Sequence, residues 1–280
     1  MSNTDQKDYW SSAAGQIWVE QQIKLDRMLQ PVLDLVLDRA ALASGARVLD
    51  VGSGTGASVA QAAALVGPSG HVTGLDISET MLAHARSRLA KTHNAACLRA
   101  DAQTHPFEFG SYDALISRFG VMFFDDTTAA FANMARGLVP GATLTLGTWG
   151  PAPQNPYFMD AAKAAKDVFG PMDKVDRTLP GPFAFEDANR VVPMLHAAQL
   201  QNVTCDKIEV YLRPPGDLQA VANLLCEIGP ANRALSYFNA SSADRARLVA
   251  TLVERMRVYE TSEGLRIPAL INLYQARTVA

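Results

Sequence analysis

A glycine-rich turn between a predicted strand and a predicted helix is the feature that most constrains the fold of this chain. The segment reads Val48-Leu-Asp-Val-Gly-Ser-Gly-Thr-Gly56, and an alanine-rich stretch from Ala57 to Val66 follows it. Glycines at such a turn let the backbone approach a ligand closely, and open α/β sheets bind ligands at the carboxyl ends of their strands. The segment therefore predicts an α/β sheet with a binding crevice at this turn.

Strand and helix patterns alternate from Ala46 to Thr148. Short β-branched or leucine-rich runs are separated by alanine-rich runs, which is typical of a parallel sheet covered by helices. We expect strands at residues 47–51, 71–76, 95–100, 112–117 and 142–148, the last after a turn at 139–141. We expect helices at residues 57–66 and 127–137, and another that begins at Ser78 and buries Met81, Leu82, Ala85 and Leu89. The pattern predicts a doubly wound sheet.

The pattern changes on both sides of this segment. Before it, we expect two helices at residues 18–29 and 32–43, separated by Pro31. After it, turn-rich residues end the alternation. There we expect two helices and then two late strands with a helical insertion between them, at residues 158–169, 186–198, 203–212 and 269–279. The chain therefore divides into residues 1–45, 46–149 and 150–280.

The composition excludes several classes of protein. The 280 residues are 48% hydrophobic and 19% charged, with a formal net charge of −3, so no basic excess favours nucleic acid as a partner. No run of about 18 apolar residues predicts a membrane span. The cysteines, Cys97, Cys205 and Cys226, are widely spaced and predict neither a disulfide framework nor a metal site. The polar start of the chain leads us to expect a cytoplasmic location.

The acid Asp50 distinguishes between two kinds of ligand for the glycine-rich turn. Gly52, Gly54 and Ala57 alone also satisfy a dinucleotide-binding fingerprint, so a dinucleotide-dependent oxidoreductase is one alternative. A dinucleotide would place an anionic pyrophosphate over this loop, where a carboxylate two residues before the first glycine repels it. A positively charged ligand is instead attracted. Asp50 therefore favours a cationic ligand.

Two further acids follow the second and third predicted strands. Asp76 lies 20 residues after Gly56, the spacing at which an acid accepts hydrogen bonds from both hydroxyls of a ribose. Asp101, one strand further out, is placed to accept hydrogen bonds from an exocyclic amine such as that of adenine. The structural alternative is that these acids only form turns, where Asp is favoured. Together they indicate an amine, a ribose and an amino-purine without phosphate, which describes S-adenosylmethionine.

Five segments, in order, carry a family resemblance. They are Val48 to Gly56, Gly74-Leu-Asp-Ile-Ser78, Ala100-Asp-Ala102, Ser117-Arg-Phe-Gly-Val-Met-Phe-Phe124 and Leu138-Val-Pro-Gly141. This series resembles class I S-adenosylmethionine-dependent methyltransferases, most closely the branch labelled ubiquinone/menaquinone-biosynthesis-like. The resemblance implies a Rossmann-like, mostly parallel sheet of seven strands with the last antiparallel, together with N-terminal helices and helical insertions in the C-terminal half.

The resemblance also implies roles around the methionine part of the cofactor. Gly52, Gly54 and Gly56 would frame it, and Asp50 would reach its amino group. Ser53 departs from the commonest form of the motif, but this side chain needs only to be small.

Further positions would hold the adenosine part and the acceptor side. Asp76 would bind the ribose hydroxyls, and Asp101 with Ala102 would read the adenine edge. Ile77 and Met81 would bracket the adenine, although a methionine at helical spacing is as often a core residue. The segment after the fourth strand would lie between cofactor and acceptor, and it contains Ser117, Arg118 and Phe119.

The resulting expectation is methyl transfer from S-adenosylmethionine to a small-molecule acceptor by in-line displacement, giving S-adenosylhomocysteine. No metal or covalent nucleophile is required, because the donor is already activated. If a base is used, His105 and Tyr9 are the candidates. We expect residues 1–45 to form a lid, or alternatively helices pinned outside the domain, and residues 150–280 to form an acceptor-binding cap. A catalytically inactive cofactor-binding relative is a further alternative. No motif identifies the acceptor or the oligomeric state.

Overall fold

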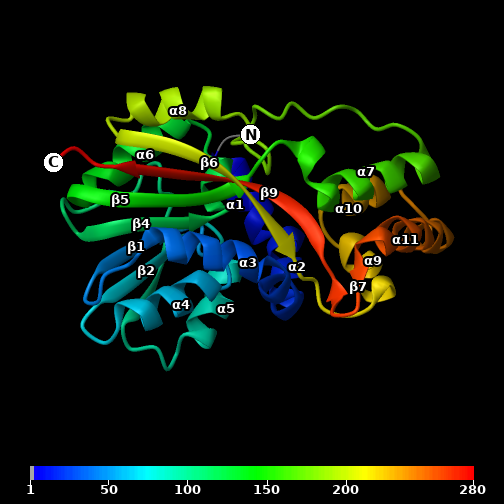
Figure 1. Cartoon of the computed structure of the whole chain (residues 1–280), viewed down its shortest axis with the longest axis horizontal. Helices are drawn as coiled ribbons and strands as arrows, with labels where there is room; N and C mark the ends of the chain where they lie inside the picture. Colours follow the sequence, from blue (N-terminus) through cyan, green and yellow to red (C-terminus); the bar gives the residue numbers. More distant parts are fainter. Residues whose placement is uncertain (1–2) are drawn as a thin grey trace.

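A seven-stranded sheet runs through the computed structural model, which describes residues 3–280 (Figure 1). The strand order is β3-β2-β1-β4-β5-β9-β6. β9 is antiparallel to both of its neighbours, whereas the pairs among β1 to β5 are parallel. The strands are β1 (Arg47–Val51), β2 (His71–Asp76), β3 (Ala95–Arg99), β4 (Tyr112–Arg118), β5 (Leu138–Trp149), β6 (Gln201–Leu212) and β9 (Ile267–Arg277). The predicted fold class is confirmed.

Helices cover both faces of the sheet (Figure 1). One face carries α3 (Gln22–Ala40), α4 (Ala57–Val66) and α5 (Glu79–Arg88), and the buried apolar side chains of α4 and of the C-terminal half of α3 cluster with Val48 of β1. The other carries α6 (Thr127–Arg136) and α8 (Ala188–Ala197), which belong to the cluster of Leu49. Neighbouring residues of a strand point to opposite faces, so these two side chains enter different layers of the core.

The elements around the glycine-rich turn have the bounds that the sequence predicts. β1, α4 and β2 begin and end at the expected residues. Ser78 caps α5, because its hydroxyl accepts a hydrogen bond from the backbone N–H of Met81 at 3.2 Å. The sequence pattern and the capping residue Ser78 therefore predict correctly where β1 and β2 end.

The predicted separation of two helices at Pro31 is wrong, because α3 continues through this residue. Proline cannot donate a backbone hydrogen bond and crowds the preceding turn, which usually ends or kinks a helix. Here Met28, Leu29, Val32 and Leu33, on both sides of Pro31, are at most 3% exposed. Their burial stabilises the continuous helix more than the missing hydrogen bond destabilises it. The break lies instead at Gln21.

The predicted turn at residues 139–141 is also wrong as a boundary, because β5 already begins at Leu138. Leu138 pairs with Tyr112, and the regular pairing resumes with Thr143 opposite Ala114. Between these pairs the register shifts, and Gly141 has a φ of +74°. The turn-forming residues therefore make an irregularity within the strand instead of a break before it.

The N-terminal helices lie at the carboxyl edge of the sheet. α1 (Asn3–Ser11) and α2 (Ala13–Glu20) are placed between the sheet and the C-terminal helices in Figure 1. Two hydroxyls near the start of α5 fix them there. Ser78 donates to the carbonyl of Trp10 at 2.6 Å, and Thr80 donates to the carbonyl of Ser11 at 3.2 Å.

The helical insertions form a separate layer at the same edge, on the right in Figure 1. They comprise α7 (Pro156–Phe169), α9 (Leu218–Leu225), α10 (Gly229–Tyr237) and α11 (Ser242–Met256), followed by a hairpin of β7 (Glu260–Thr261) and β8 (Gly264–Leu265). Leu248, Leu252 and Met256 form the buried face of α11. Within residues 3–280, no helix is both long and apolar enough to cross a membrane.

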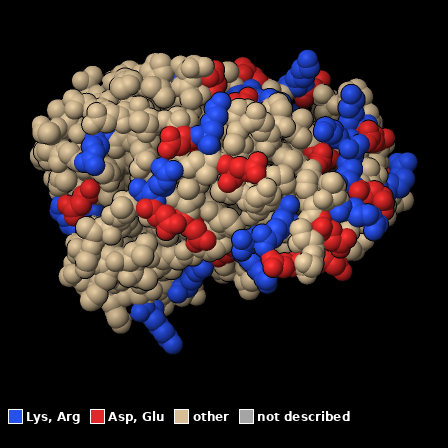
Figure 2. Space-filling model, in the orientation of Figure 1, with Lys and Arg blue, Asp and Glu red and all other residues tan. Residues whose placement is uncertain are grey.

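Charged side chains of both signs are intermixed on the face seen in Figure 2. Among the described residues, charged side chains form ion pairs such as Arg245 with Glu227 and Arg247 with Asp244, both at 2.6 Å. Exposed pairs of this kind contribute little to stability. This face therefore presents no extended surface of a single sign.

Candidate functional site

Asp50 is a buried acid with one unpartnered oxygen. It is 0% exposed, near the end of β1. Its Oδ2 accepts a hydrogen bond from the hydroxyl of Ser58 in α4, whereas Oδ1 has no partner and no contact with solvent. Burial raises the pKa of Asp50 to about 7, against the opposing effects of the Ser58 hydrogen bond and the positive charge of Arg118. A cationic ligand would stabilise the ionised form.

Asp76 holds the glycine-rich turn in place. Its Oδ2 accepts a hydrogen bond from the N–H of Gly54 and its Oδ1 from the N–H of Ser78, both at 2.8 Å. Burial raises the pKa of this carboxyl, and the backbone hydrogen bonds oppose the rise. A carboxylate has about four acceptor positions, so both oxygens retain capacity for ribose hydroxyls.

Asp101 is partly exposed after β3 and contacts the N-terminal helix. Both of its oxygens accept from the amide nitrogen of Asn3, at 3.1 and 2.9 Å, and Oδ1 also accepts from the N–H of Gln103 at 2.9 Å. The neighbouring Ala102 is buried, and its carbonyl accepts from Asn133 of α6 at 3.0 Å. The three predicted acids thus lie at the ends of three adjacent strands, β1, β2 and β3.

The three glycines of the turn have different surroundings. A Cβ on Gly52 would lie 2.4 Å from the Cα of Gly120, so this glycine permits direct contact between two backbones. A Cβ on Gly56 would lie 3.1 Å from Ala85 of α5. A Cβ on Gly54 would meet only the sulfur of Met81, at 3.9 Å. Of the three, Gly54 has the most open space beside it.

The end of β4 carries two polar side chains, Ser117, whose hydroxyl is hydrogen-bonded, and Arg118, which has an unpartnered nitrogen. The hydroxyl of Ser117 donates to the carbonyl of Val51 at 2.7 Å and accepts from the N–H of Gly120 at 3.2 Å, so it ties β4 to the turn. Arg118 is different, because its Nη1 is buried without a partner. Burial lowers the pKa of this guanidinium, and the acids Asp26 and Asp50 oppose that effect.

Phe119 adopts a backbone conformation that is unusual for a bulky residue. Its φ is +67°, in the left-handed region, and its N–H donates to the carbonyl of Gly147 at 2.8 Å. The ring stacks on Trp149 with centroids 4.3 Å apart, and Trp149 in turn stacks on Tyr157 at 6.1 Å. Such strain persists where surrounding contacts enforce it, often at functional sites. These three rings join the end of β4 to α7.

The remaining predicted cofactor residues surround the same turn. Met81 is 6% exposed, near Gly54, and Ile77 is partly buried directly after Asp76. Ser53 is 5% exposed, and its hydroxyl has no hydrogen-bond partner. Polar groups buried in this way usually find a partner. The segment from Val48 to Gly56 therefore holds two unpartnered polar atoms, Asp50 Oδ1 and the Ser53 hydroxyl, three residues apart in sequence.

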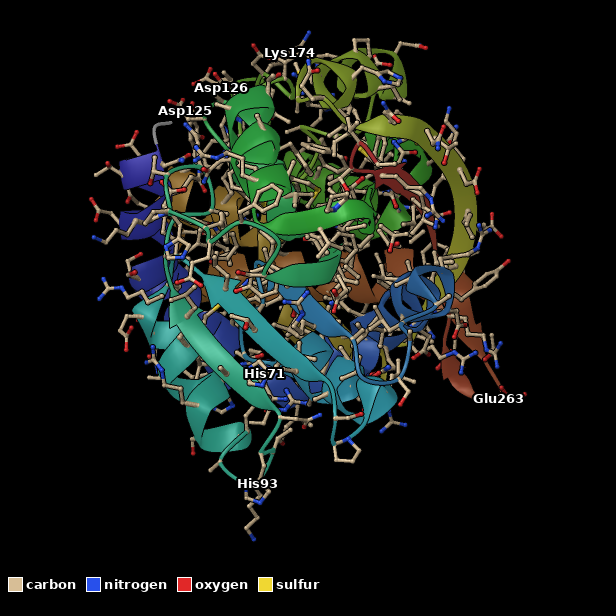
Figure 3. All side chains as sticks on the ribbon, turned by 90° about the vertical axis from the view of Figure 1, so that its left-hand side faces the viewer. His71, His93, Asp125, Asp126, Lys174 and Glu263 are labelled. Carbon is tan, nitrogen blue, oxygen red and sulfur yellow. The ribbon has the colours of Figure 1, made fainter. Side chains whose placement is uncertain are left out.

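The two candidate bases pack in different groups of aromatic rings. His105 packs edge-to-face on Phe107, with ring centroids 4.8 Å apart, and Tyr9 packs on Trp10 at 5.1 Å. Within residues 3–280, neither side chain forms a hydrogen bond with Asp50, Asp76 or Asp101. His71 and His93, labelled in Figure 3, are exposed at the amino-terminal edge of the sheet, opposite these acids.

Several residues at this edge were not identified from the sequence. Asn3 contacts Asp101 although 98 residues separate them, and its Oδ1 accepts from the N–H of Asp125, which Figure 3 labels before α6. Gly120 touches Gly52, and Ser58 bonds Asp50. Ser58 lies eight residues after Asp50, on the face of α4 that meets β1, and this spacing was a usable signal. The contacts of Asn3 had none.

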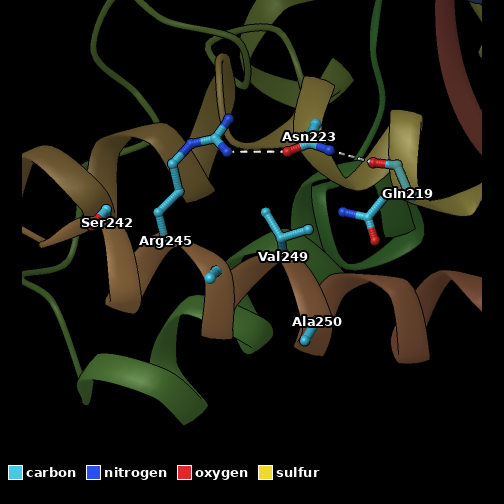
Figure 4. Close-up of a pocket in the computed structure, with 7 residues that line it drawn as sticks. Gln219, Asn223, Ser242, Arg245, Val249 and Ala250 are labelled. Atoms are coloured by element: carbon cyan, nitrogen blue, oxygen red, sulfur yellow. Dashed lines mark hydrogen bonds between the residues drawn. The ribbon is translucent and has the colours of Figure 1, made fainter.

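Neither of two surface pockets is near these acids. Figure 4 shows a groove of about 370 Å³ between α9 and α11, where Arg245 donates to Asn223 at 3.1 Å. A second pocket of about 470 Å³ lies beside α8. No group of three or more potential metal ligands occurs in the part of the chain that the structure describes.

Comparison with known sequences identifies the core. Residues 48–141 match the family model of a methyltransferase domain. The demethylmenaquinone methyltransferase of Staphylococcus aureus is 36% identical over 106 residues, which are 38% of this chain and 44% of that protein. The match therefore spans less than half the length of this curated relative. The match to the family model, at residues 48–141, contains the turn and all three acids.

Comparison with solved structures extends over more of the chain. Phosphoethanolamine N-methyltransferase 2 of Haemonchus contortus, solved in complex with S-adenosyl-L-methionine, has a TM-score of 0.60 and 17% identity, covering 98% of this chain and 60% of that one. The YcgJ protein of Bacillus subtilis has a TM-score of 0.55 and 17% identity, covering 89% and 98%. These likenesses establish a shared fold. With the sequence match, the resemblance of the core to class I methyltransferases is confirmed.

Proposed function

We propose that this protein is an S-adenosylmethionine-dependent methyltransferase that acts on a small molecule. The observation that carries the proposal is the set of three carboxylates at adjacent strand ends, within a segment that matches a methyltransferase domain. A carboxylate at each position suits a cationic, phosphate-free nucleoside. No observation favours the dinucleotide alternative or an inactive relative.

The residues present fit this cofactor. Asp50 Oδ1 and the Ser53 hydroxyl are buried and unpartnered, so polar groups of a ligand would satisfy them. Asp50 would take the amino group, Asp76 the ribose hydroxyls, and Asp101 with Ala102 the adenine edge. Ile77 and Met81 would pack on the adenine, and Gly54 would give the methionine part close access to the backbone.

The main chemical role of the chain would be to position the acceptor against the methyl group of the cofactor and to exclude water. S-adenosylmethionine, when bound, supplies a methyl group already activated by the positive sulfur. The side chains would align the acceptor about 3–3.5 Å from that methyl group and keep water out. Phe119 is placed at the boundary between the turn and α7, where its ring would separate the two ligands. His105 and Tyr9 remain the proposed bases for an acceptor that must lose a proton.

The two flanking regions would close the site. Residues 1–45 would form the lid, supported by the hydrogen bonds of Trp10 with Ser78 and of Asn3 with Asp101. Residues 150–280 would form the acceptor-binding cap, supported by the stacked rings of Phe119, Trp149 and Tyr157 that connect it to the core. A cytoplasmic location remains our prediction from the sequence.

The acceptor is proposed only as a class. One relative is named for a demethylmenaquinone and one structural neighbour for a phosphoethanolamine, which are chemically unlike each other. Because the acceptor would be chosen by the cap, which lies outside the sequence match, neither name transfers to this chain. A small molecule is the class that both have in common.

Isothermal titration calorimetry tests the cofactor assignment. We expect S-adenosylmethionine to bind with 1:1 stoichiometry, and nicotinamide dinucleotides not to bind. Incubation with a methyl-labelled donor and a metabolite extract should then yield a labelled small molecule and S-adenosylhomocysteine. Binding of a dinucleotide without binding of the sulfonium donor would contradict the proposal, and binding without transfer would indicate an inactive relative.

A further inference from the structure

Two buried atoms of opposite charge lie unpaired beside the glycine-rich turn. Asp50 Oδ1 and Arg118 Nη1 have neither solvent contact nor a hydrogen-bond partner. Asp50 of β1 pairs with Ile116 of β4, and Arg118 follows Ile116 by two residues. Paired residues of adjacent strands, and residues two apart on one strand, point to the same face. The carboxylate and the guanidinium therefore share one face of the sheet at its carboxyl edge.

Asp50 and Arg118 each favour the charged form of the other but form no ion pair. The charge of Arg118 favours the ionised form of Asp50, and the charge of Asp50 favours the protonated form of Arg118. Among the ion pairs found within residues 3–280, however, none links them. A buried charge without a hydrogen-bonded partner is costly, so each group gains from a ligand that brings the opposite charge.

The other acid near Arg118 is already engaged. Asp26 of α3 forms an ion pair with Arg88 of α5 at 2.6 Å, and the same oxygen accepts from Gln22. Its negative charge helps to keep Arg118 protonated but leaves Nη1 without a hydrogen bond. The structure thus offers a guanidinium donor and a carboxylate acceptor that no other described side chain satisfies.

We propose that Arg118 and Asp50 recognise the zwitterionic amino-acid end of the cofactor, Arg118 binding its carboxylate and Asp50 its ammonium group. This inference rests on the proposed function, because it assigns the two ends of S-adenosylmethionine. An α-amino acid carries both charged groups on one carbon, so it would pair with both side chains, which form no ion pair with each other in the structure. The planar guanidinium suits a carboxylate, and both contacts are charge-assisted. Arg118 is thereby a specificity-determining residue against donors that lack the carboxylate.

Binding of two donors by two proteins tests this assignment. Calorimetry compares S-adenosylmethionine with decarboxylated S-adenosylmethionine on the wild-type protein and on Arg118→Gln. We expect the wild type to bind the decarboxylated donor about 10- to 100-fold more weakly, and Arg118→Gln to bind both donors equally, about 10- to 100-fold more weakly than the wild type binds S-adenosylmethionine. Arg118→Lys should retain part of the discrimination between the two donors, because lysine keeps the positive charge but lacks the paired N–H donors of the planar guanidinium.

Two further measurements show whether Arg118→Gln weakens only the binding of the amino-acid end or the binding of the whole cofactor. 5′-Methylthioadenosine lacks the whole amino-acid end, so its affinity should be the same in the wild type and Arg118→Gln. Arg86→Gln removes an exposed positive charge that pairs with Glu79 on α5, and it should keep the discrimination. Loss of methylthioadenosine binding in Arg118→Gln, or undiminished discrimination in it, would overturn the inference. Absence of any binding by the wild type would instead refute the proposed function.

Discussion

The carboxyl edge of the sheet and the helical cap differ in how many of their buried polar atoms lack a hydrogen-bond partner. At the edge, Asp50, Ser53 and Arg118 bury polar atoms that have no partner. In the cap, helices α7, α9, α10 and α11 bury mainly apolar side chains, the Nε of Arg255 is one buried polar atom without a partner, and charges such as those of Arg245 and Glu227 pair at the surface. Unpartnered buried polar atoms destabilise a fold, whereas buried apolar area stabilises it.

Because of this difference, we expect substitutions in the two regions to affect different quantities, ligand affinity at the edge and the free energy of unfolding in the cap. Substitutions at the edge should change ligand affinity much more than the free energy of unfolding, and some should even stabilise the protein. Substitutions in the cap core should do the reverse. This expectation agrees with the common observation that functional sites are not optimised for stability.

The largest effect is expected at Asp76. Asp76→Ala removes the proposed hydrogen-bond acceptor of the ribose and also leaves the N–H groups of Gly54 and Ser78 without their partner. The affinity for S-adenosylmethionine, measured by calorimetry, should fall at least about 100-fold. Asp113→Ala is the matched control, because Asp113 pairs with Arg47 at the opposite edge of the sheet. Unchanged affinity in Asp76→Ala would remove this residue from the site.

A substitution in the cap should give the opposite result. Leu252 of α11 is 0% exposed, so Leu252→Ala should lower the free energy of unfolding by about 2–5 kcal/mol. Urea titration measures this loss, and calorimetry on the folded variant should give nearly the wild-type cofactor affinity. Val258→Ala, at a side chain that is 76% exposed, should change stability by less than about 0.5 kcal/mol. A large loss of affinity in Leu252→Ala would mean that the two regions are not separable.

The pH dependence of stability should reveal the burial of Asp50. Its pKa is raised from 3.8 to about 7, so between these values the unfolded chain has lost a proton that the folded chain keeps. The free energy of unfolding therefore falls as pH rises from about 4 to 7, by up to about 4 kcal/mol for this group, and is flat above 7.

The variant Asp50→Asn isolates this contribution from those of Asp76 and Arg118, the charged groups that act on Asp50. Urea titrations at several pH values should show that the difference between wild type and Asp50→Asn grows with pH, with the variant the more stable above pH 7. The same variant should bind S-adenosylmethionine more weakly. A pH-independent difference in stability would show that Asp50 is ionised throughout this range.

The smallest effect concerns the lid. The amide of Asn3 bonds both oxygens of Asp101, where the adenine amine is proposed to bind, so the two donors would compete. Asn3→Ala should bind S-adenosylmethionine about two- to fivefold more tightly and faster, because Asp101 no longer exchanges one donor for another. Stopped-flow fluorescence of Trp10 and Trp18 measures the rate. Gln16→Ala, which removes an exposed contact with Glu20, is the control. Weaker binding in Asn3→Ala would mean that Asn3 holds the closed, ligand-bound lid.

The core was predictable because its signals are local. The bounds of β1, α4 and β2 follow from apolar runs, glycines and the Ser78 cap, all within a few residues of the feature that they define. The placement of Asp50, Asp76 and Asp101 at adjacent strand ends followed from the same series. Which of their oxygens have partners did not, since this also depends on side chains from distant elements, such as Asn3, whose amide bonds both oxygens of Asp101.

The rest of the fold depends on contacts between distant residues. Pro31 locally favours a helix end, but the buried side chains on either side of it belong to a helix that packs across the sheet. The contact of Asn3 with Asp101 and the stacking of Phe119 on Trp149 likewise join segments far apart in sequence. Periodicity predicts that the cap is helical but not which distant segments its helices pack against.

The backbone contact between Gly52 and Gly120 bears on the order in which the two substrates arrive. A Cβ at either position would collide with the other loop, so the loop that would receive the donor cannot shift without moving the loop that precedes Phe123. Phe123 in turn packs on Trp10 of α1, at 5.3 Å between ring centroids. Under the proposed function, binding of the donor would thereby affect the position of α1, part of the proposed lid, and ordered binding with the donor first is the kinetic scheme that such a coupling would favour.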